Sequence, residues 1–319
     1  MSGVLAVTAP VYLLLAAGFL ATRYGLFQRA DMRVFGKYVI NLALPALLFN
    51  ALSQRQVGEV LNPVFIAAYL GGSLAVMVAG VLWMRRVAGK SLSASAIMGM
   101  GMSCPNSGFI GFPLVAQLFG AGTGGVVLAL AMIVENFFLI PIALAIADSD
   151  GADGTSASRI ARWRAALAQS LAGLVRNPMI HGLALGFLFS LLEWRLPEPM
   201  ARAVGLLAAS CSAISLFVIG GSLAGTAIRG IWRDVSWVVV GKLLVHPLAV
   251  LLLVMVLPPM PRELQVAAVI IAAVPTMGIY PILAQKYGHD AMAASAQLGA
   301  TVVSFLTLTA LIWVLAPSV

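Results

Sequence analysis

The sequence predicts an all-α, polytopic membrane protein with ten transmembrane helices arranged as two inverted five-helix repeats. Three observations predict it: few charges, ten long apolar segments, and a repeat at one constant offset. Only 9% of the 319 residues are charged and 61% are hydrophobic, and the mean hydropathy is +1.01. Because a soluble domain carries about 25% charged residues, this composition excludes a cytosolic enzyme and a nucleic-acid-binding protein.

The apolar segments define the spans. A transmembrane helix needs ~20 mostly apolar residues, and ten such segments, bounded by charges, proline or glycine, follow one another along the chain. They are 4–22, 35–52, 63–84, 93–118, 125–147, 177–194, 204–225, 235–257, 264–286 and 290–315. The first positive charge, Arg23, follows the first segment, which predicts a retained span rather than a signal peptide.

The basic residues predict the orientation in the membrane. Of the 19 Lys and Arg residues, 14 fall in the loops on one side of the predicted membrane and four on the other. The positive-inside rule makes the basic side cytoplasmic. We therefore expect a multi-pass protein of the plasma (bacterial inner) membrane with both termini extracytoplasmic. The net charge of +8 then reflects topology, and we expect no nucleic-acid partner.

The repeat appears when the sequence is shifted by 168 residues. The window 112–120 then aligns with 280–288, with Pro, Ala, Gln and Gly identical, and Pro10 and Gly18 align with Pro178 and Gly186. Each half has five spans, so the second half enters the membrane from the opposite side. Inverted repeats of this kind are typical of secondary transporters that work by alternating access.

The repeat also divides the chain into segments. We predict a first repeat over 1–147, a cytoplasmic linker over 148–176, and a second repeat over 177–319. Apolar residues recur at helical spacing among arginines in the linker: Ile160, Trp163, Leu167, Leu171 and Leu174. This pattern predicts a basic amphipathic helix on the membrane surface that joins the two halves.

The fourth and ninth spans are predicted to be broken. Span four contains Cys-Pro-Asn-Ser-Gly-Phe-Ile-Gly-Phe-Pro over 104–113, and span nine contains Val-Pro-Thr-Met-Gly-Ile-Tyr-Pro over 274–281. Each motif has two prolines with glycine between them, which favours non-helical backbone. Unwound backbone at membrane depth is tolerated only where protein buries it or where it lines a polar cavity. The alternative is a pair of proline kinks that serve packing alone.

Two such breaks in inverted repeats should cross near the membrane midplane. The half-helices beyond them would direct their positive N-terminal ends at the crossing, which favours an anion with one or two carboxylates. Asn106, Ser107 and Thr276 would add neutral hydrogen bonds. We therefore expect a carrier for a small organic anion, with the lipid bilayer as its environment and with no cofactor or metal.

The two motifs resemble the paired crossover motifs of the auxin efflux carrier family, the PIN-like transporters, in its bacterial type. The resemblance implies the fold of bile-acid symporters and sodium–proton antiporters, with a scaffold of spans 1, 2, 6 and 7 and a transport domain of spans 3–5 and 8–10. It also implies elevator-type motion, transport of malonate-like dicarboxylates or auxin-like weak acids, and a homodimer through the scaffold. Together with the two motifs, it defines the candidate substrate-binding residues: Pro105, Asn106, Ser107, Gly108, Pro275, Thr276, Met277 and Gly278, with Asn41 and Ser215 from spans two and seven.

Three ionisable residues lie inside predicted spans. Glu135 in span five is a candidate for proton coupling or gating, or a structural hydrogen-bond partner. Lys242 and His246 share one face of span eight. Lys242 can snorkel toward the cytoplasm, whereas His246 could pair with Glu135 or titrate. No set of carboxylates indicates a dedicated sodium site, although backbone carbonyls at the breaks could bind sodium.

Other function classes remain as alternatives. An anion channel could use the same half-helix dipoles, and a proton- or sodium-coupled symporter could use the same fold. An intramembrane enzyme is disfavoured because the chain lacks an HExxH motif and a paired-aspartate arrangement. A receptor that binds the anion without moving it would need a signalling domain, which these segments do not include.

Overall fold

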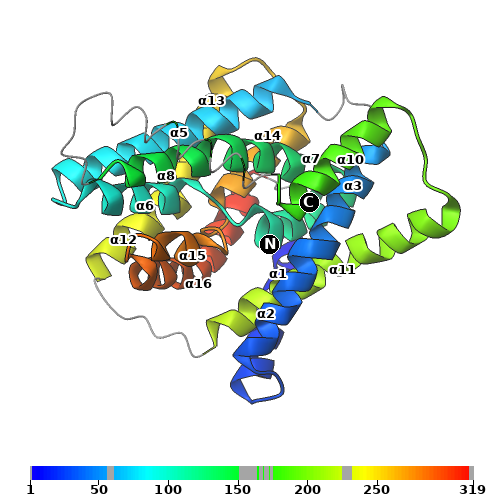
Figure 1. Cartoon of the computed structure of the whole chain (residues 1–319), viewed down its shortest axis with the longest axis horizontal. Coiled ribbons are helices and arrows are strands. Elements are labelled where there is room, and N and C mark those ends of the chain that lie inside the picture. The colour runs from blue at the N-terminus through cyan, green and yellow to red at the C-terminus, as the bar shows by residue number, and fades with distance from the viewer. Residues whose placement is uncertain are drawn as a thin grey trace.

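The computed structural model describes residues 2–55, 61–150, 175–224 and 232–315, with Arg164, Ala168 and Ala172 between them, and the side chains from residue 9 onward. These residues form helices and connecting turns, without a strand among them (Figure 1). The predicted amphipathic helix of the linker lies almost wholly outside the described residues.

The elements follow one another in this order: α1 (Ser2–Arg23), α2 (Arg29–Tyr38), η1 (Val39–Ala43), α3 (Leu44–Ser53), α5 (Pro63–Arg86), α6 (Leu92–Ser103), η2 (Ser107–Gly111), α7 (Phe112–Val134), η3 (Glu135–Leu139), α8 (Ile140–Asp148), α10 (Pro178–Leu191), α11 (Glu198–Leu223), α12 (Trp232–Val240), η4 (Gly241–Val245), α13 (His246–Val256), α14 (Arg262–Ala273), α15 (Tyr280–Gln285) and α16 (Asp290–Leu315). The η elements are π-helical turns that continue directly into the next α-helix.

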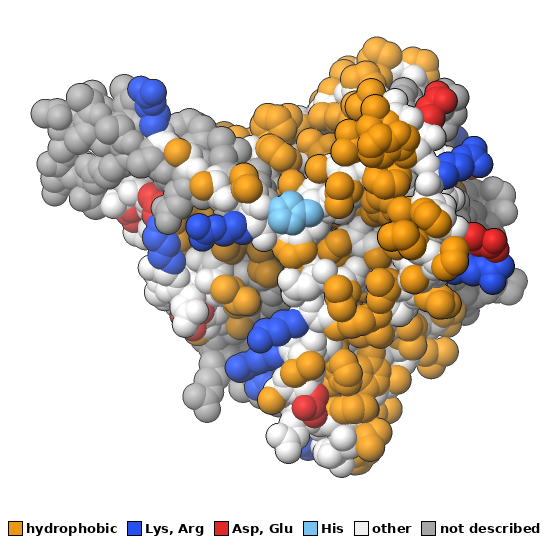
Figure 2. Space-filling model, turned by 45° about the vertical axis from the view of Figure 1, so that its right-hand side comes forward, with side chains coloured by type: hydrophobic (Ala, Val, Ile, Leu, Met, Phe, Trp, Pro, Cys, Tyr) orange, Lys and Arg blue, Asp and Glu red, His pale blue; other side chains and the backbone are white. Residues whose placement is uncertain are grey.

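Six of the helical segments among the described residues are long and apolar enough to cross a membrane. They are Arg29–Ser53, Pro63–Arg86, Ser107–Asp148, Glu198–Leu223, Trp232–Val256 and Asp290–Leu315. Large apolar side chains such as Leu206 and Val256 are exposed on their outer surfaces, and Figure 2 shows such side chains gathered over one face. Because apolar surface of this extent requires lipid around it, the chain is a polytopic membrane protein.

The segment Ser107–Asp148 bends sharply at Gly120. Gly120 has φ 84° and ψ 157°, which lies outside the helical region, and it connects the part of α7 that starts at Phe112 with the part that ends at Val134. The segment has 42 residues, and at 1.5 Å per residue a straight helix of that length would be about twice as long as a bilayer core is thick. The glycine therefore allows the chain to turn back.

Each π-helical turn is followed by a proline. Pro45, Pro113, Pro141 and Pro247 each occupy the second position of the helix after a π-helical turn. Proline lacks the amide hydrogen and its ring clashes with the carbonyl of residue i−4, so the preceding turn widens to i→i+5 bonding. Such turns often occur at functional sites, and here they contain Asn41, Ser107, Glu135 and Lys242.

The helices pack in two groups. Helices α1, α2 and α3 pack against α11, and α10 packs against α3. These five helices gather on one side in Figure 1. Helices α5, α6, α8, α12, α13, α14, α15 and α16 form the second group through pairs such as α5 with α6 and α13 with α14. Helix α7 contacts both groups, and α11 packs against η2.

Glycines allow α1 and α11 to approach closely. A Cβ at Gly220 would lie 1.9 Å from the carbonyl oxygen of Leu15, and one at Gly18 would lie 2.0 Å from that of Phe217. Both obstacles are backbone atoms, which cannot move aside without separating the helices. Small residues at such contacts are typical of membrane helix packing, where close van der Waals contact provides the attraction.

We expect Gly220→Ala to destabilise the protein by about 1–3 kcal/mol, because the added methyl forces the two backbones apart. Gly205→Ala is the matched control, since it lies in the same helix and a Cβ there would meet nothing within 4 Å. Thermal unfolding in detergent measures both variants. Equal unfolding temperatures for them would contradict this account of the α1–α11 contact.

Candidate functional site

The two predicted interruptions are present and lie against each other. Helix α6 ends at Ser103 and η2 starts at Ser107, while α14 ends at Ala273 and the next helix starts at Tyr280. Between them Pro105 and Thr276 form an antiparallel bridge. The Asn106 amide donates to the Pro275 carbonyl at 2.8 Å, and the Met277 amide donates to the Cys104 carbonyl at 3.1 Å. The interruptions therefore satisfy each other's backbone groups, as buried non-helical backbone must.

The second half-helix is short and ends at Gln285, next to residue 286, where the sequence places the end of span nine. Helix α15 has only six residues, and the chain then turns through Gly288, whose φ is 72°, before α16 begins. The helix after the first interruption is longer, because η2 continues into α7 as far as the bend at Gly120. Only this longer helix can provide the positive N-terminal end that we expect at the crossing.

Six of the eight predicted crossing residues are buried, namely Pro105, Asn106, Ser107, Pro275, Thr276 and Met277. Gly108 is half-buried and Gly278 is exposed. The Asn106 side chain caps η2, because its Oδ1 accepts from the Phe109 amide at 3.2 Å. A Cβ at Gly278 would meet Asn106 Nδ2 at 3.7 Å and no other atom within 4 Å. The Asn106 amide group therefore lies next to the exposed edge of the crossing.

Thr276 provides a second polar group at the crossing. Its side chain is 1% exposed, and its Oγ1 has no hydrogen-bond partner among the described residues. A buried hydroxyl without a partner costs about 1–3 kcal/mol, and such groups are often satisfied by a ligand or water. The crossing thus combines an amide, a free hydroxyl and a helix N-terminus within a buried region.

Glu135 lies directly beside the first interruption. Its Oε1 accepts hydrogen bonds from Ser107 Oγ at 2.5 Å and from the Tyr69 hydroxyl at 2.8 Å. The residue is 5% exposed. An acid is thus held near the N-terminal end of η2, where a negative charge is stabilised. Sequence analysis missed Tyr69, because nothing in the uniformly apolar segment 63–84 distinguishes its inward face.

The structure corrects two expectations for span eight. Lys242 does not snorkel: it is 0% exposed, and its ammonium donates to the Ala272 carbonyl and to His246 Nδ1, the latter at 3.0 Å. His246 bonds to Ser73 at 2.8 Å rather than to Glu135, and the Tyr69 ring lies beside it with centroids 6.1 Å apart. Because an ammonium only donates, Nδ1 accepts and a neutral His246 ring carries its hydrogen on Nε2.

The ammonium of Lys242, which belongs to η4, contacts the C-terminal end of α14, immediately before the second interruption. The last carbonyls of a helix have no intrahelical partners and carry partial negative charge, so the ammonium stabilises this end. The first interruption has the opposite arrangement, with the Glu135 carboxyl at a positive end. Glu135 and Lys242 therefore each lie at a helix end of complementary charge.

The structure does not bring Asn41 to the crossing. Its side chain is exposed, its Nδ2 donates to the Lys37 carbonyl at 2.7 Å, and it lines a pocket of about 310 Å³ beside Pro45 and His181. Ser215 is fully buried in α11 with its Oγ 3.7 Å from Cys211 Sγ. Among the described residues, no cluster of three His, Cys, Asp or Glu could hold a metal ion.

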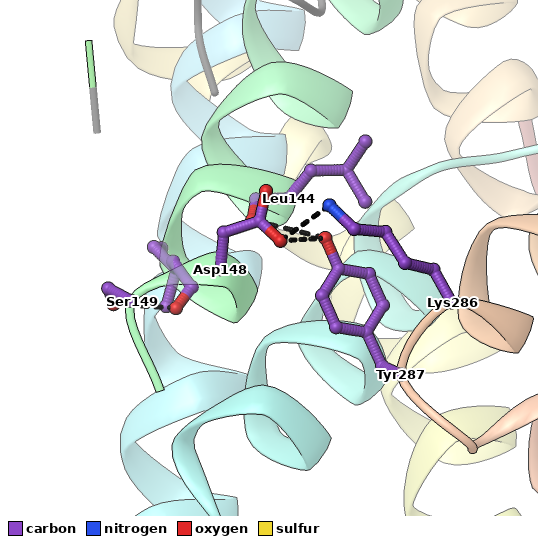
Figure 3. Close-up of polar contacts among 6 residues, drawn as sticks. Leu144, Asp148, Ser149, Lys286 and Tyr287 are labelled. Atoms are coloured by element: carbon purple, nitrogen blue, oxygen red, sulfur yellow. Dashed lines mark hydrogen bonds and ion pairs between the residues drawn. The ribbon is translucent and has the colours of Figure 1, made fainter. Parts of the chain in front are cut away.

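A cluster of polar contacts ties the end of α15 to α8. Asp148 Oδ1 accepts from Lys286 Nζ at 2.7 Å and from the Tyr287 hydroxyl at 2.8 Å, and both side chains are directed at the carboxylate in Figure 3. Burial, followed by the bond to Asp148, raises the pKa of Tyr287 above its ordinary value, so its hydroxyl donates at neutral pH. These contacts join two helices of the second group.

Comparison with known proteins identifies the family. The family described as "Membrane transport protein" matches residues 4–314. The chain belongs to this family. The match confirms the resemblance to the auxin efflux carrier family that the two interrupted motifs indicated. Membership makes the chain a membrane transporter rather than a member of an enzyme family.

Curated relatives cover nearly the whole chain. "Uncharacterized transporter YfdV" of Escherichia coli (strain K12) is 24% identical over 96% of this chain and 95% of its own length. The "Putative malonate transporter" of Rhizobium meliloti (strain 1021) is 26% identical over 99% of this chain and 97% of its own length. An "Uncharacterized transporter" of Methanothermobacter thermautotrophicus is 27% identical over 75% of this chain and 74% of its own length.

Proposed function

We propose that this member of the membrane transport protein family is a secondary carrier for small organic anions and binds them at the crossing of its two interrupted helices. The observation that carries the proposal is the crossing itself, where Pro105 and Thr276 pair and Asn106 and Thr276 are buried. Malonate-like dicarboxylates are the substrate class we favour, in line with the name of the Rhizobium relative. Auxin-like weak acids share the required carboxylate.

The chemistry of the crossing fits a carboxylate. The helix that starts at Ser107 directs free amide hydrogens and about half a positive charge at this point. The Asn106 amide can donate through Nδ2, and the unpartnered Thr276 hydroxyl can donate through Oγ1. Neutral donors orient an anion without placing a permanent buried charge beside it, so the ligand remains able to leave.

The membrane arrangement belongs to the same proposal. Ten membrane passes in two inverted repeats require the bend at Gly120 to divide Ser107–Asp148 into two passes. This arrangement places both termini outside and the central loop in the cytoplasm. The group of α1, α2, α3, α10 and α11 corresponds to the proposed scaffold, which would also form the homodimer contact. The group that contains the crossing corresponds to the transport domain, which would move past the scaffold as an elevator. The polar cluster at Asp148 supports this by keeping α8 and α15 together.

Glu135 is the proposed coupling group. Its Oε1 faces Ser107 and Tyr69, and Lys242 is the other titratable group whose charge acts on it. When Glu135 is ionised, it competes with a substrate anion for the positive end of η2. When it is protonated, that helix end is free for the substrate. Binding of a proton and an organic anion would therefore support each other, which favours proton coupling over sodium coupling.

Counterflow in proteoliposomes tests the proposed function. Purified protein is reconstituted with unlabelled malonate inside, and uptake of radiolabelled malonate is followed, with succinate, acetate and indole-3-acetate tested in the same way. The binding site of a carrier reorients faster with substrate bound than when it is empty. We therefore expect internal substrate to stimulate uptake of at least one acid. Uptake without such stimulation would indicate an anion channel, and no uptake of any acid would contradict the proposal.

A further inference from the structure

Two pockets meet at the C-terminal end of α3. The smaller pocket, of about 440 Å³, lies where α3 and α11 face α7. The larger, of about 1140 Å³, lies where α3 faces the end of α10 and the start of α11. The residues that line both pockets are Asn50, Gln54 and Arg55. This shared wall is polar, and Gln54 Nε2 donates to Asn50 Oδ1 at 2.7 Å, which leaves Arg55 as its charged group.

Arg55 reaches from one helix group to the other. It follows the last turn of α3, and a Cβ at Gly122 of α7 would lie 2.8 Å from its Nη2 atom. Arg55 is half-buried, and it forms no ion pair with any described residue. A guanidinium that has no carboxylate partner among the described residues, at the edge of two pockets, is suited to bidentate binding of a carboxylate from outside the protein.

Basic residues are scarce on the predicted extracytoplasmic side of the molecule, so the places where they occur suggest a function. The sequence places only four basic residues on the predicted extracytoplasmic side: Arg55, Arg195, Arg202 and Arg262. Two of them, Arg55 and Arg195, line the larger pocket, where Glu193 is the acidic residue of the wall. The positive-inside rule disfavours arginine here, so topology does not explain why two arginines stand at one pocket.

The smaller pocket extends from Arg55 toward the crossing. It is also lined by Leu47 and by Phe112, and Phe112 directly follows η2. Leu47 precedes Arg55 by two helical turns, which is about 12 Å at the rise of an α-helix. A small organic acid cannot contact both ends at once. The guanidinium therefore stands at the mouth of the path, ahead of the binding site.

We propose that Arg55 forms an anion-capture site at the extracytoplasmic mouth, which binds the carboxylate of the substrate before it reaches the crossing. The inference rests on the proposed function, because it requires that the protein transports organic anions. A fixed positive charge at the mouth of a low-dielectric cleft raises the local concentration of anions and the rate of their association. The charge acts on arrival of the substrate, so it lowers KM more than it changes the maximal rate.

Arg55 could instead serve only to stabilise α3, since a cation at a helix C-terminus interacts favourably with the helix dipole. That role and the capture role have different consequences. Loss of a stabilising charge would lower the amount of folded protein and the maximal rate, and it would leave KM unchanged. Loss of a capture site would raise KM, and added salt would reduce the difference because it screens exposed charges.

The experiment measures initial uptake from the extracytoplasmic side by right-side-out vesicles at low and high ionic strength. The probe is radiolabelled malonate, or the acid of the counterflow panel that the wild-type protein transports fastest. The variants are Arg55→Gln and Arg55→Lys. Arg202→Gln is the matched control, because Arg202 has the same charge on the same side, pairs with Glu198 on the surface, and lines neither pocket.

We expect Arg55→Gln to raise KM about tenfold at low ionic strength and to change the maximal rate less than about twofold, within the range of electrostatic steering. Arg55→Lys should keep most of the affinity, and the Arg55→Gln effect should shrink in high salt. An unchanged KM in Arg55→Gln, or the same change in Arg202→Gln, would overturn the capture site while wild-type transport upholds the proposed function. No uptake by the wild-type protein would overturn both.

Discussion

Asn106→Ala should reduce kcat/KM for organic anion transport by about 10- to 100-fold, because it removes a neutral donor to a charged ligand, an interaction of ~1.5–3 kcal/mol. Asn106 lies at the start of the helix that faces the crossing, and its Nδ2 is the atom nearest to a Cβ added at Gly278. No other described side chain combines a donor with the exposed edge of the crossing in this way. The measurement is counterflow of radiolabelled malonate, or of the fastest acid of the panel.

The control for Asn106→Ala must account for its second role as a helix cap. Asn62→Ala removes the same kind of cap, because Asn62 Oδ1 accepts from the Phe65 amide at 2.9 Å at the start of α5. Each cap contributes about 1 kcal/mol, so both variants should lose similar stability. Only Asn106→Ala should lose transport. Equal transport by the two variants would remove Asn106 from the site.

Glu135→Gln should abolish the response of transport to a pH gradient. In wild-type vesicles a gradient of one pH unit should increase accumulation of the anion by up to about tenfold if one proton accompanies it, since one unit corresponds to 1.36 kcal/mol. Glutamine keeps an oxygen that accepts from Ser107 and Tyr69, but it cannot bind or release the proton. The variant should therefore only equilibrate its substrate.

Glu263→Gln is the control for that experiment. Glu263 is an exposed acid at the start of α14 whose Oε2 accepts from Thr123 at 3.3 Å, so its substitution removes a carboxylate away from the crossing. We expect this variant to respond to the gradient as the wild-type protein does. Gradient-driven accumulation by Glu135→Gln would contradict proton coupling through Glu135, and it would leave Glu135 as a structural hydrogen-bond partner.

The interruptions were predictable because their cause is local. Proline removes a backbone donor at a known position, and glycine beside it lowers the cost of leaving the helix, so residues 104–106 and 274–279 could be located from the sequence. Their mutual contact followed from the repeat. The end of the second half-helix was also predictable, since span nine was predicted to end at 286 and α15 ends at Gln285, shortly before the turn at Gly288.

The buried polar groups were harder to predict because their partners come from distant helices. Lys242 has a long stem, and the sequence allows it either to snorkel or to turn inward. The deciding partner, the Ala272 carbonyl, is free only because α14 ends there. Tyr69 and Ser73 lie on an apolar helix without any local signal. The prolines at 45, 113, 141 and 247 were an unused signal, since each follows a π-helical turn that contains a candidate residue.

Arg55 shows a similar limit. The sequence showed its charge and predicted its side of the membrane, but its relation to Gly122 required the packing of α3 against α7. Pockets form between elements that are far apart in the chain, and a single sequence without a structure does not define them.

Protection of a cysteine at position 278 tests the central claim most directly. Gly278 is exposed at the crossing and has room for a Cβ, whereas the native Cys104 and Cys211 are buried. In detergent, Gly278→Cys should react with N-ethylmaleimide about tenfold more slowly when the transported acid is present at ten times its Kd. Tyr24→Cys, at an exposed loop position, should react at one rate throughout. Equal labelling of Gly278→Cys with and without an acid that the protein transports would contradict binding at the crossing.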